Sequence, residues 1–111
     1  MKIILFILIL IALLYIFPIG QIVGDSMHPT FKDGEIVLMC RIYKLKENNV
    51  YYFTREGKDV IKRLYSIQHS DEKWLYFLGD NSKDSFDSRH YGFINSKQVK
   101  AKILFKIGGK K

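Results

Sequence analysis

Residues 98–107 read QVKAKILFKI, and this stretch decides the class of fold that the sequence predicts. Apolar side chains occupy every second position from Val99 to Ile107, and lysines hold three of the four positions between them. Alternation with a period of two is typical of a strand with one buried and one exposed face. The stretch therefore predicts an amphipathic β-strand.

Four shorter runs earlier in the chain are rich in β-branched and aromatic residues, which favour strands. The residues REGK at 55–58 predict a hairpin between the second run and the third. A polar loop bounded by Gly79 and Gly92 follows the fourth run. We therefore expect a small, mostly β domain, whose strands include 35–42, 50–54, 59–65 and 74–78.

The chain begins with an apolar segment, residues 3–19, that contains no charged side chain. As a helix with a rise of 1.5 Å per residue it would extend about 25 Å, which is just enough to span a bilayer. Pro18 disfavours helix at the residue before it, so the helix should end near residue 17. We expect a transmembrane anchor over 1–20 and a β-rich domain over 21–111. A cleavable secretory signal is the alternative, but no convincing A-x-A cleavage pattern follows the segment.

The formal net charge of +7 suits a domain that lies on anionic lipid headgroups, and it can also indicate nucleic-acid binding. Because the apolar segment is unexplained in a nucleic-acid binder, we expect the lipid bilayer as a partner and no nucleic acid. The few flanking basic residues favour an N-terminus in the cytoplasm and a domain on the extracytoplasmic side of the cell membrane.

Cysteine and histidine give little support to a disulfide or a metal site. Cys40 is the single cysteine, which excludes an intramolecular disulfide, and its apolar neighbours predict a buried structural thiol. The three histidines, His28, His69 and His90, lie far apart and have no cysteine pairs beside them. We expect neither a metal nor an organic cofactor.

The stretch GDSMHPTF at 24–31 offers a candidate nucleophile, Ser26, directly after the apolar segment. A serine hydroxyl needs a neighbouring base to take its proton. His28 lies two residues away, and nothing in the sequence places a carboxylate behind its ring. Another residue type must therefore be considered as the base.

Lys62 could serve as this base if burial lowered its pKa toward neutrality. On a strand, Val60, Lys62 and Leu64 share one face, so the lysine has apolar neighbours on its own side. Periodicity alone leaves open that the opposite face, with Ile61, is the buried one. In that case Lys62 would point to solvent.

Three segments in this order resemble the type I signal peptidase family, whose members are membrane-anchored Ser/Lys endopeptidases. They are GDSMHPTF at 24–31, IKRL at 61–64 and GDNSKDSFDSRHYGF at 79–93. The resemblance covers residues 1 to about 94. It implies a β-sheet catalytic domain of signal-peptidase type, with Ser26 as the nucleophile and Lys62 as the general base.

The resemblance also implies supporting roles for other residues. Ser85 would hydrogen-bond and orient Lys62, and Asp87 and Arg89 would form an ion pair. The backbone N–H of Ser26 would donate to the oxyanion, but Gly24 stands where some members carry a serine that adds a second donor. The remaining expected site residues shape the floor, Gly79, Asp80 and Asn81, or hold the turn of the nucleophile, Met27 and Pro29.

The expected function is cleavage of N-terminal signal peptides from exported preproteins through an acyl-enzyme on Ser26. By family analogy, small residues would be preferred at the first and third positions before the cut. One alternative is a dedicated peptidase for a single pilin or conjugation-type substrate. Another is a catalytically inactive, membrane-tethered accessory β-domain. The sequence leaves the oligomeric state open.

Overall fold

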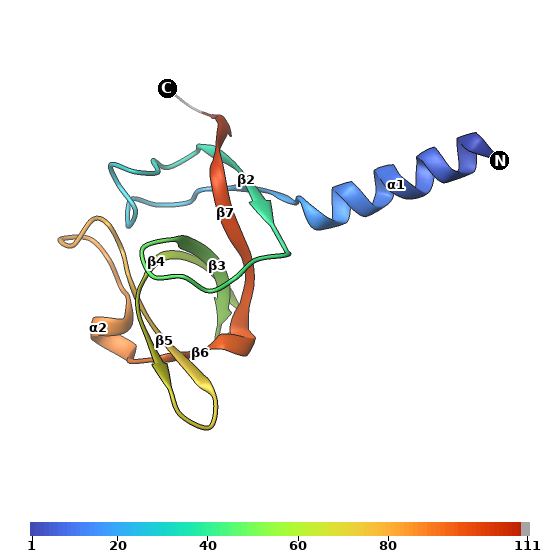
Figure 1. Cartoon of the computed structure of the whole chain (residues 1–111). Coiled ribbons are helices and arrows are strands. Elements are labelled where there is room, and N and C mark those ends of the chain that lie inside the picture. The colour runs from blue at the N-terminus through green and yellow to red at the C-terminus, as the bar shows by residue number, and fades with distance from the viewer. Residues whose placement is uncertain (110–111) are drawn as a thin grey trace.

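The computed structural model describes residues 1–109, which form one N-terminal helix and an antiparallel β-sheet (Figure 1). Helix α1 spans Lys2–Ile16, the short helix α2 spans Ser88–Tyr91, and a 3-10 turn η1 spans Ser96–Gln98. The strand order within the described residues is β1-β2-β7-β3-β4-β5-β6, and every neighbouring pair is antiparallel. The strands are β1 (Ile19–Gln21), β2 (Ile36–Cys40), β3 (Val50–Arg55), β4 (Lys58–His69), β5 (Lys73–Leu78), β6 (Ile94–Asn95) and β7 (Val99–Gly108).

The prediction of a mostly β domain is confirmed, and the stretch that opened the sequence argument is strand β7. Its alternation holds from Val99 to Ile103, where every second side chain is buried. The prediction is wrong for Phe105 and Ile107, which are 54% and 47% exposed. Beyond Lys102 the strand no longer pairs with β3 and continues beside β2 alone, so no core covers its apolar face there.

Helix α1 ends at Ile16, close to the predicted end, and none of its side chains is buried. The predicted transmembrane helix over 1–20 is not confirmed, because no helix in residues 1–109 is long and apolar enough to cross a membrane. The apolar segment divides at Pro18. Ile19 and Gly20, which the prediction gave to the anchor, form strand β1 together with Gln21 and pair with β2 instead.

The core consists of two clusters that share strand β3. Successive side chains of a strand point to opposite faces, so Tyr52 packs against one cluster while Tyr51 and Phe53 belong to the other. The first cluster contains Met27, the neighbour of Ser26, and the second contains Leu64, which follows Lys62 on its strand. Each partner of the expected dyad is thus anchored in a different cluster.

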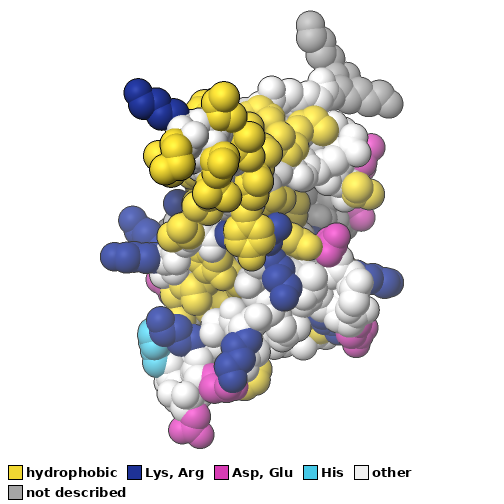
Figure 2. Space-filling model, turned by 90° about the vertical axis from the view of Figure 1, so that its right-hand side faces the viewer, with side chains coloured by type: hydrophobic (Ala, Val, Ile, Leu, Met, Phe, Trp, Pro, Cys, Tyr) yellow, Lys and Arg dark blue, Asp and Glu magenta, His cyan; other side chains and the backbone are white. Residues whose placement is uncertain are grey.

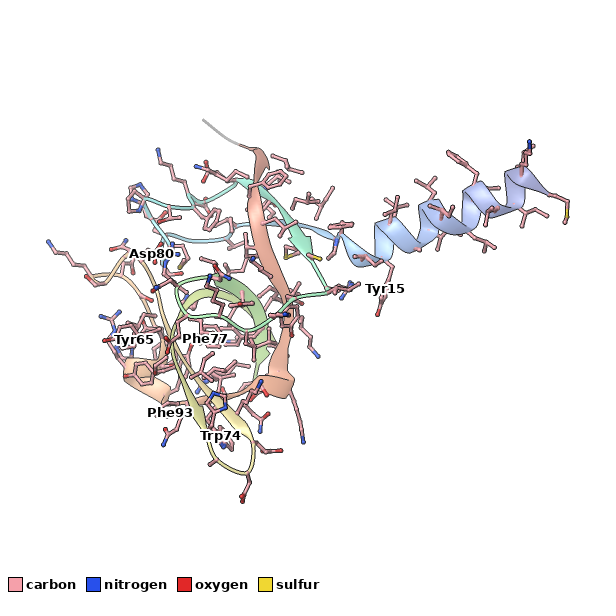
Figure 3. All side chains as sticks on the ribbon, viewed as in Figure 1. Tyr15, Tyr65, Trp74, Phe77, Asp80 and Phe93 are labelled. Atoms are coloured by element: carbon pink, nitrogen blue, oxygen red, sulfur yellow. The ribbon has the colours of Figure 1, made fainter. Side chains whose placement is uncertain are left out.

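Aromatic packing gives the second cluster its rigidity. The rings of Phe53 and Phe77 stack with their centroids 4.4 Å apart, and both side chains are fully buried. Phe77 lies on β5 near the middle of the domain (Figure 3). Stacked pairs of this kind add about 0.5–1.5 kcal/mol beyond the burial of their surface. The strand that carries Lys62 is therefore backed by a well-packed layer.

Cys40 differs from its prediction, because its thiol is only partly buried. In β2 the inward positions are taken by Val37 and Met39, which places Cys40 on the alternate face at the end of the strand. Its Sγ donates to the carbonyl of Ile42 at 3.0 Å.

Candidate active site

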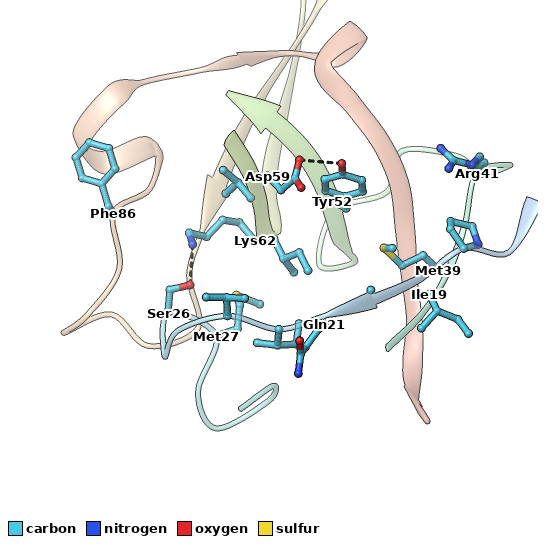
Figure 4. Close-up of a pocket in the computed structure, with 16 residues that line it drawn as sticks. Ile19, Gln21, Ser26, Met27, Met39, Arg41, Tyr52, Asp59, Lys62 and Phe86 are labelled. Carbon is cyan, nitrogen blue, oxygen red and sulfur yellow. Dashed lines mark hydrogen bonds between the residues drawn. The ribbon is translucent and has the colours of Figure 1, made fainter. Parts of the chain in front are cut away.

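Ser26 and Lys62 meet at the floor of a groove (Figure 4). The Nζ atom of Lys62 lies 2.7 Å from the Oγ atom of Ser26 and donates to it. Ser26 comes from the turn after β1, and Lys62 comes from β4, 36 residues later. The lysine is only 6% exposed, so this contact is shielded from water.

The surroundings of Lys62 favour its neutral form. Burial lowers the pKa of its amine, and the negative charge of Asp87 opposes part of that shift. The alternation of β4 explains the burial, because Lys62 shares its face with the fully buried Leu64. A neutral amine has a lone pair, so it can accept the proton of a serine hydroxyl.

The turn of the nucleophile is held by the segment that follows β5. The N–H of Asn81 donates to the carbonyl of Ser26 at 2.9 Å, and its side-chain amide donates to the carbonyl of Asp25 at 3.0 Å. The N–H of Asp80 points at the sulfur of Met27 at 3.4 Å. Met27 is 2% exposed and locks the turn into the first core cluster. These contacts bring Met27, Asp80 and Asn81 together around Ser26, as the resemblance implies.

Gly79 and Gly24 are each required in the site, for different structural reasons. A Cβ atom on Gly79 would lie 2.7 Å from both the carbonyl oxygen of Ser26 and the Cβ of Ser85, so only glycine fits there. Gly24 has a φ of +87°, which L side chains rarely adopt, and no atom within 4 Å of an added Cβ. Gly24 is thus required by the backbone of the turn, and Gly79 by close packing.

Asp87 is a fully buried hub for five hydrogen bonds. The expected ion pair is present, with Arg89 Nη2 at 2.6 Å and Nε at 3.0 Å from the carboxylate. Burial alone would raise the pKa of Asp87, but the hydrogen bonds from Arg89, Gly79 and Ser85 outweigh it and hold this pKa far below its usual range. The carboxylate stays ionised and orders the loop.

Ser85 differs from the role that the resemblance implies. Its hydroxyl donates to Asp87 at 2.9 Å, and no hydrogen bond joins it to Lys62 in the described part of the chain. A carboxylate two residues away is a stronger acceptor than a neutral group, which explains this choice. The lone pairs of the hydroxyl remain able to accept from an amine.

The site contains a second ion pair, which the sequence did not predict. Arg63 donates to both oxygens of Asp80, at 2.8 and 2.7 Å, and Thr30 donates to the same carboxylate at 2.5 Å. This clamp ties β4 to the 79–81 segment and to the turn of the nucleophile. Both charged residues stand inside the recognised segments, but 17 positions separate them, and only the fold shows that they pair.

Pro29 lies on the exposed side of the turn and follows a cis peptide bond from His28. His28 and His69 are exposed and make no contact with the dyad in the described residues. The N–H of Asp87 donates to Nδ1 of His90 at 3.3 Å, and the His90 ring stacks on Phe86 with the centroids 5.0 Å apart. Among residues 1–109, no group of three or more histidine, cysteine or acidic side chains could hold a metal ion.

The groove has a volume of about 480 Å³ and two extended walls, residues 18–23 and 59–62. Each wall has an unpaired edge. Strand β1 ends the sheet order, and β4 pairs with β5 only from Arg63 onward. Such edges offer backbone N–H and C=O groups to an extended peptide. The dyad lies at one end of this groove, and Arg41 and Ile19 lie toward the other (Figure 4).

Comparison with known proteins identifies the family of this chain. The sequence model of the family described as Peptidase S24-like matches residues 18–104. The chain is 30% identical over 99 residues to the Signal peptidase I of Buchnera aphidicola subsp. Baizongia pistaciae (strain Bp), a match that covers 80% of this chain and 32% of that relative. The chain therefore aligns with about a third of the relative's length. Because the family match extends over most of its residues, and the likeness to a signal peptidase I confirms the resemblance carried by the three segments, the chain belongs to the Peptidase S24-like family.

Proposed function

We propose that this protein is a membrane-anchored serine endopeptidase that removes N-terminal signal peptides from exported preproteins. One observation carries the proposal, the 2.7 Å contact between the buried amine of Lys62 and the hydroxyl of Ser26. A serine hydroxyl needs an adjacent base to act as a nucleophile, and a buried lysine whose pKa is lowered can be that base.

In the first half of the reaction, neutral Lys62 takes the proton of Ser26 while Oγ attacks the carbonyl carbon of the scissile bond. The backbone N–H of Ser26 donates to the oxygen that becomes negative. Lys62 then passes its proton to the leaving amine, and the C–N bond breaks. The signal peptide remains as an ester on Ser26.

In the second half, Lys62 takes a proton from a water molecule, whose oxygen attacks the ester carbonyl. The C–Oγ bond breaks, and the proton held by Lys62 returns to Ser26. The bound acyl group leaves as a carboxylic acid, which releases its remaining proton to solvent to give the carboxylate, and the dyad is restored. Through both steps Asn81 holds the backbone of Ser26 by its hydrogen bond to the Ser26 carbonyl, and Asp87 holds the neighbouring Gly79.

The groove suits a substrate in extended conformation between its two unpaired edges. Its walls carry apolar side chains next to the dyad, among them Ile22, Met27 and Ile61. Small apolar substrate side chains before the cut would fit against them, in keeping with the expected preference for alanine-like residues. Exported preproteins present such a segment directly after an apolar stretch.

The membrane anchor is proposed from helix α1. Its apolar side chains are exposed up to Tyr15, and Figure 2, in which α1 points toward the viewer, shows a nearly continuous hydrophobic cluster. We place α1 in the lipid bilayer, with the β domain on the extracytoplasmic face. Burying this surface in hydrocarbon would remove it from water, which is favourable by about 25 cal/mol per Å².

Arg41 fixes the end of α1 beside the groove. Its N–H donates to the carbonyl of Ile16 and its Nε to that of Tyr15, both at 2.8 Å, and its guanidinium lies 4.8 Å from the centroid of the Tyr15 ring. Arg41 also lines the groove. A substrate in the groove would therefore pass close to the point where α1 ends, which supports the proposal of a cut near the membrane surface.

The test is reconstitution of the full chain into lipid vesicles with a preprotein that carries alanine at the first and third positions before the cut. Wild type should cleave it, while Ser26→Ala and Lys62→Ala should each reduce cleavage to background. Ser70→Ala and Lys100→Ala are matched controls at exposed positions outside the groove, and they should cleave normally. Cleavage that survives both dyad substitutions would overturn the mechanism. A wild type that processes no preprotein would favour the accessory domain.

A further inference from the structure

A second cavity adjoins the groove on the face of β4 that carries Lys62, and no step of the proposed reaction uses it. It has a volume of about 280 Å³ and is lined by Arg55, Glu56, Lys58, Val60, Phe86 and Tyr91. Val60 and Phe86 line the groove as well, so the two cavities share a wall. A substrate side chain that points past Val60 therefore reaches this cavity.

The two walls of the groove run in the same direction. Each step in the order β1-β2-β7-β3-β4 joins antiparallel strands, and four such steps leave β1 and β4 parallel. Ser26 follows β1, and Lys62 lies four positions after Lys58 on β4, so the dyad lies toward the C-terminal end of each wall. From Lys62, the cavity therefore extends along β4 toward the end of the groove where Pro18 lies.

The proposed function gives the direction of the substrate between these walls. The apolar part of a signal peptide lies in the bilayer beside α1, so the substrate enters the groove at the Pro18 end and reaches the dyad last. Its residues before the cut then run parallel to β4, beside the edge that is unpaired before Arg63. Residues level with one another on neighbouring strands point their side chains to the same face.

Alternation divides the substrate side chains between the two faces of β4. The first and third residues before the cut, for which we expect small side chains, lie level with Ile61 and Asp59, and Ile61 packs against the first core cluster. The second and fourth residues then lie level with Val60 and Lys58, on the face of the cavity. Both strands advance about 6.6–6.8 Å per two residues, so the register holds over this distance.

Aromatic rings hold the guanidinium of Arg55 in position. Its Cζ lies 4.1 Å from the centroid of the Tyr91 ring and 5.6 Å from that of Phe86, and the two rings lie 5.3 Å apart. Phe86 is 61% exposed, so core packing does not explain this side chain. Arg55 is paired directly with Lys58 across the β3–β4 hairpin. The arrangement is a preformed wall with a fixed positive charge.

The charge of this cavity is positive. Arg55 and Lys58 face a single lining carboxylate, Glu56, whose side chain is 75% exposed and lies 3.5 Å from Arg55. Such an exposed pair is weak, and across residues 1–109 no other carboxylate forms a salt bridge with either cation. Asp59 belongs to the other face of β4 and accepts from the hydroxyl of Tyr52 at 2.9 Å. The chemistry of the cavity suits an acidic side chain.

We propose that this cavity is the subsite for the fourth substrate residue before the cut, and that it favours an aspartate or glutamate there. The inference rests on the proposed function, which sets the direction of the substrate. The fourth residue lies level with Lys58, and Arg55 is the direct partner of Lys58 across the hairpin, so a carboxylate at this position meets two cations.

The experiment uses the full-length protein in vesicles and preprotein peptides that keep alanine at the first and third positions before the cut and carry Glu, Gln or Lys at the fourth. Wild type should show kcat/KM about tenfold higher for Glu than for Lys, since an attraction is exchanged for a repulsion. The same exchange at the second position after the cut, on the far side of the dyad from the hairpin, should change kcat/KM little. For wild type the ratio should shrink in 0.5 M salt, a result that requires no variant.

Removal of the two cations should abolish the preference. In Arg55→Gln/Lys58→Gln the ratio should fall close to one. In Lys58→Gln, a change at an exposed position that leaves the aromatic wall intact, the ratio should fall to about threefold. The matched control is Lys44→Gln/Lys100→Gln, which removes two charges at exposed positions outside both cavities and should keep the wild-type ratio.

Failure of this inference can be distinguished from failure of the proposed function. Cleavage with equal kcat/KM for Glu and Lys at the fourth position would overturn the subsite and leave the peptidase intact, as would a preference that both Lys58→Gln and the double variant leave unchanged. If wild type cleaves nothing, the same peptides are titrated against Ser26→Ala protein. Tighter binding of the Glu peptide would then support the subsite alone, and equal or absent binding would overturn it.

Discussion

Asp87→Asn is the substitution that separates the structural and the electrostatic parts of this site. Asp87 is fully buried, with Oδ1 accepting two hydrogen bonds from Arg89 and Oδ2 accepting three, from Arg89, Ser85 and Gly79. An asparagine would keep its oxygen toward the three donors and turn its amide toward Arg89, so two hydrogen bonds are lost. Since each is worth about 0.5–1.5 kcal/mol, or more to a charged group, we expect a loss of about 2–4 kcal/mol in the free energy of unfolding. We expect a loss below the top of that range, because Arg89 is 39% exposed and water can replace its lost hydrogen bonds.

The same substitution should change the pH dependence of stability. The pKa of Asp87 is held below that of the unfolded chain, near 3.9, so its stabilisation is present above that pH and is lost as the pH falls through the folded value. The penalty for Asp87→Asn should therefore be larger at pH 7 than at pH 3. Urea unfolding at the two values measures it.

The catalytic effect should go in a defined direction. Asp87 opposes the lowering of the Lys62 pKa by burial, so removing its charge should lower that pKa further. The acid limb of the kcat/KM profile should move to lower pH. Asp80→Asn is the matched control, because it also breaks a bidentate ion pair, while Asp80 is not among the groups that shift the Lys62 pKa. An acid limb that stays in place in Asp87→Asn, or moves to higher pH, would refute the electrostatic reasoning.

Three further substitutions test the packing around the dyad. Lys62→Met should abolish cleavage and raise the free energy of unfolding at pH 7 by about 1 kcal/mol, because a buried amine with a lowered pKa destabilises the wild-type fold at that pH. The wild type regains this stability only as the pH rises toward 10. Chemical denaturation of both proteins at pH 7 and pH 10 measures the difference. Gly79→Ala should cost about 1–3 kcal/mol and most of kcat through the clash with the Ser26 carbonyl, whereas Gly108→Ala, with open space around it, should change the melting temperature little. Leu64→Ala should lower the free energy of unfolding by about 2–5 kcal/mol, because it opens a cavity behind β4. Leu104→Ala, at a 37% exposed position, should lower it far less in the same urea unfolding assay. Equal losses would contradict the assignment of the core.

The fold was predictable where local pattern and burial agree. The alternation in residues 98–107 identified β7, and the REGK turn identified the β3–β4 hairpin. The sequence pattern gave wrong predictions where contacts with other elements determine burial and pairing. Phe105 keeps the period of the strand but extends past the edge of the core, and Ile19 is apolar like the helix before it yet pairs with β2 after Pro18.

The candidate site was predictable as a set of residues, because the recognised segments carry them. Their contacts were not, since hydrogen bonds depend on distances that the fold alone sets. Ser85 stands where the resemblance implies, but its hydroxyl donates to Asp87. Arg63 and Asp80 lie in two of the segments, and only the approach of β4 to the loop after β5 pairs them. No local pattern joins Arg55 to Phe86 across 31 positions.

The measurement that tests the central claim most directly is an NMR titration of the Lys62 side chain, assigned by comparison with Lys62→Met. The account predicts that this amine loses its proton at a pH well below the value of about 10.4 that is typical of an unperturbed lysine, and that its pKa coincides with the acid limb of the kcat/KM profile. A Lys62 amine whose pKa lies at or above that unperturbed value would contradict its role as the base for Ser26.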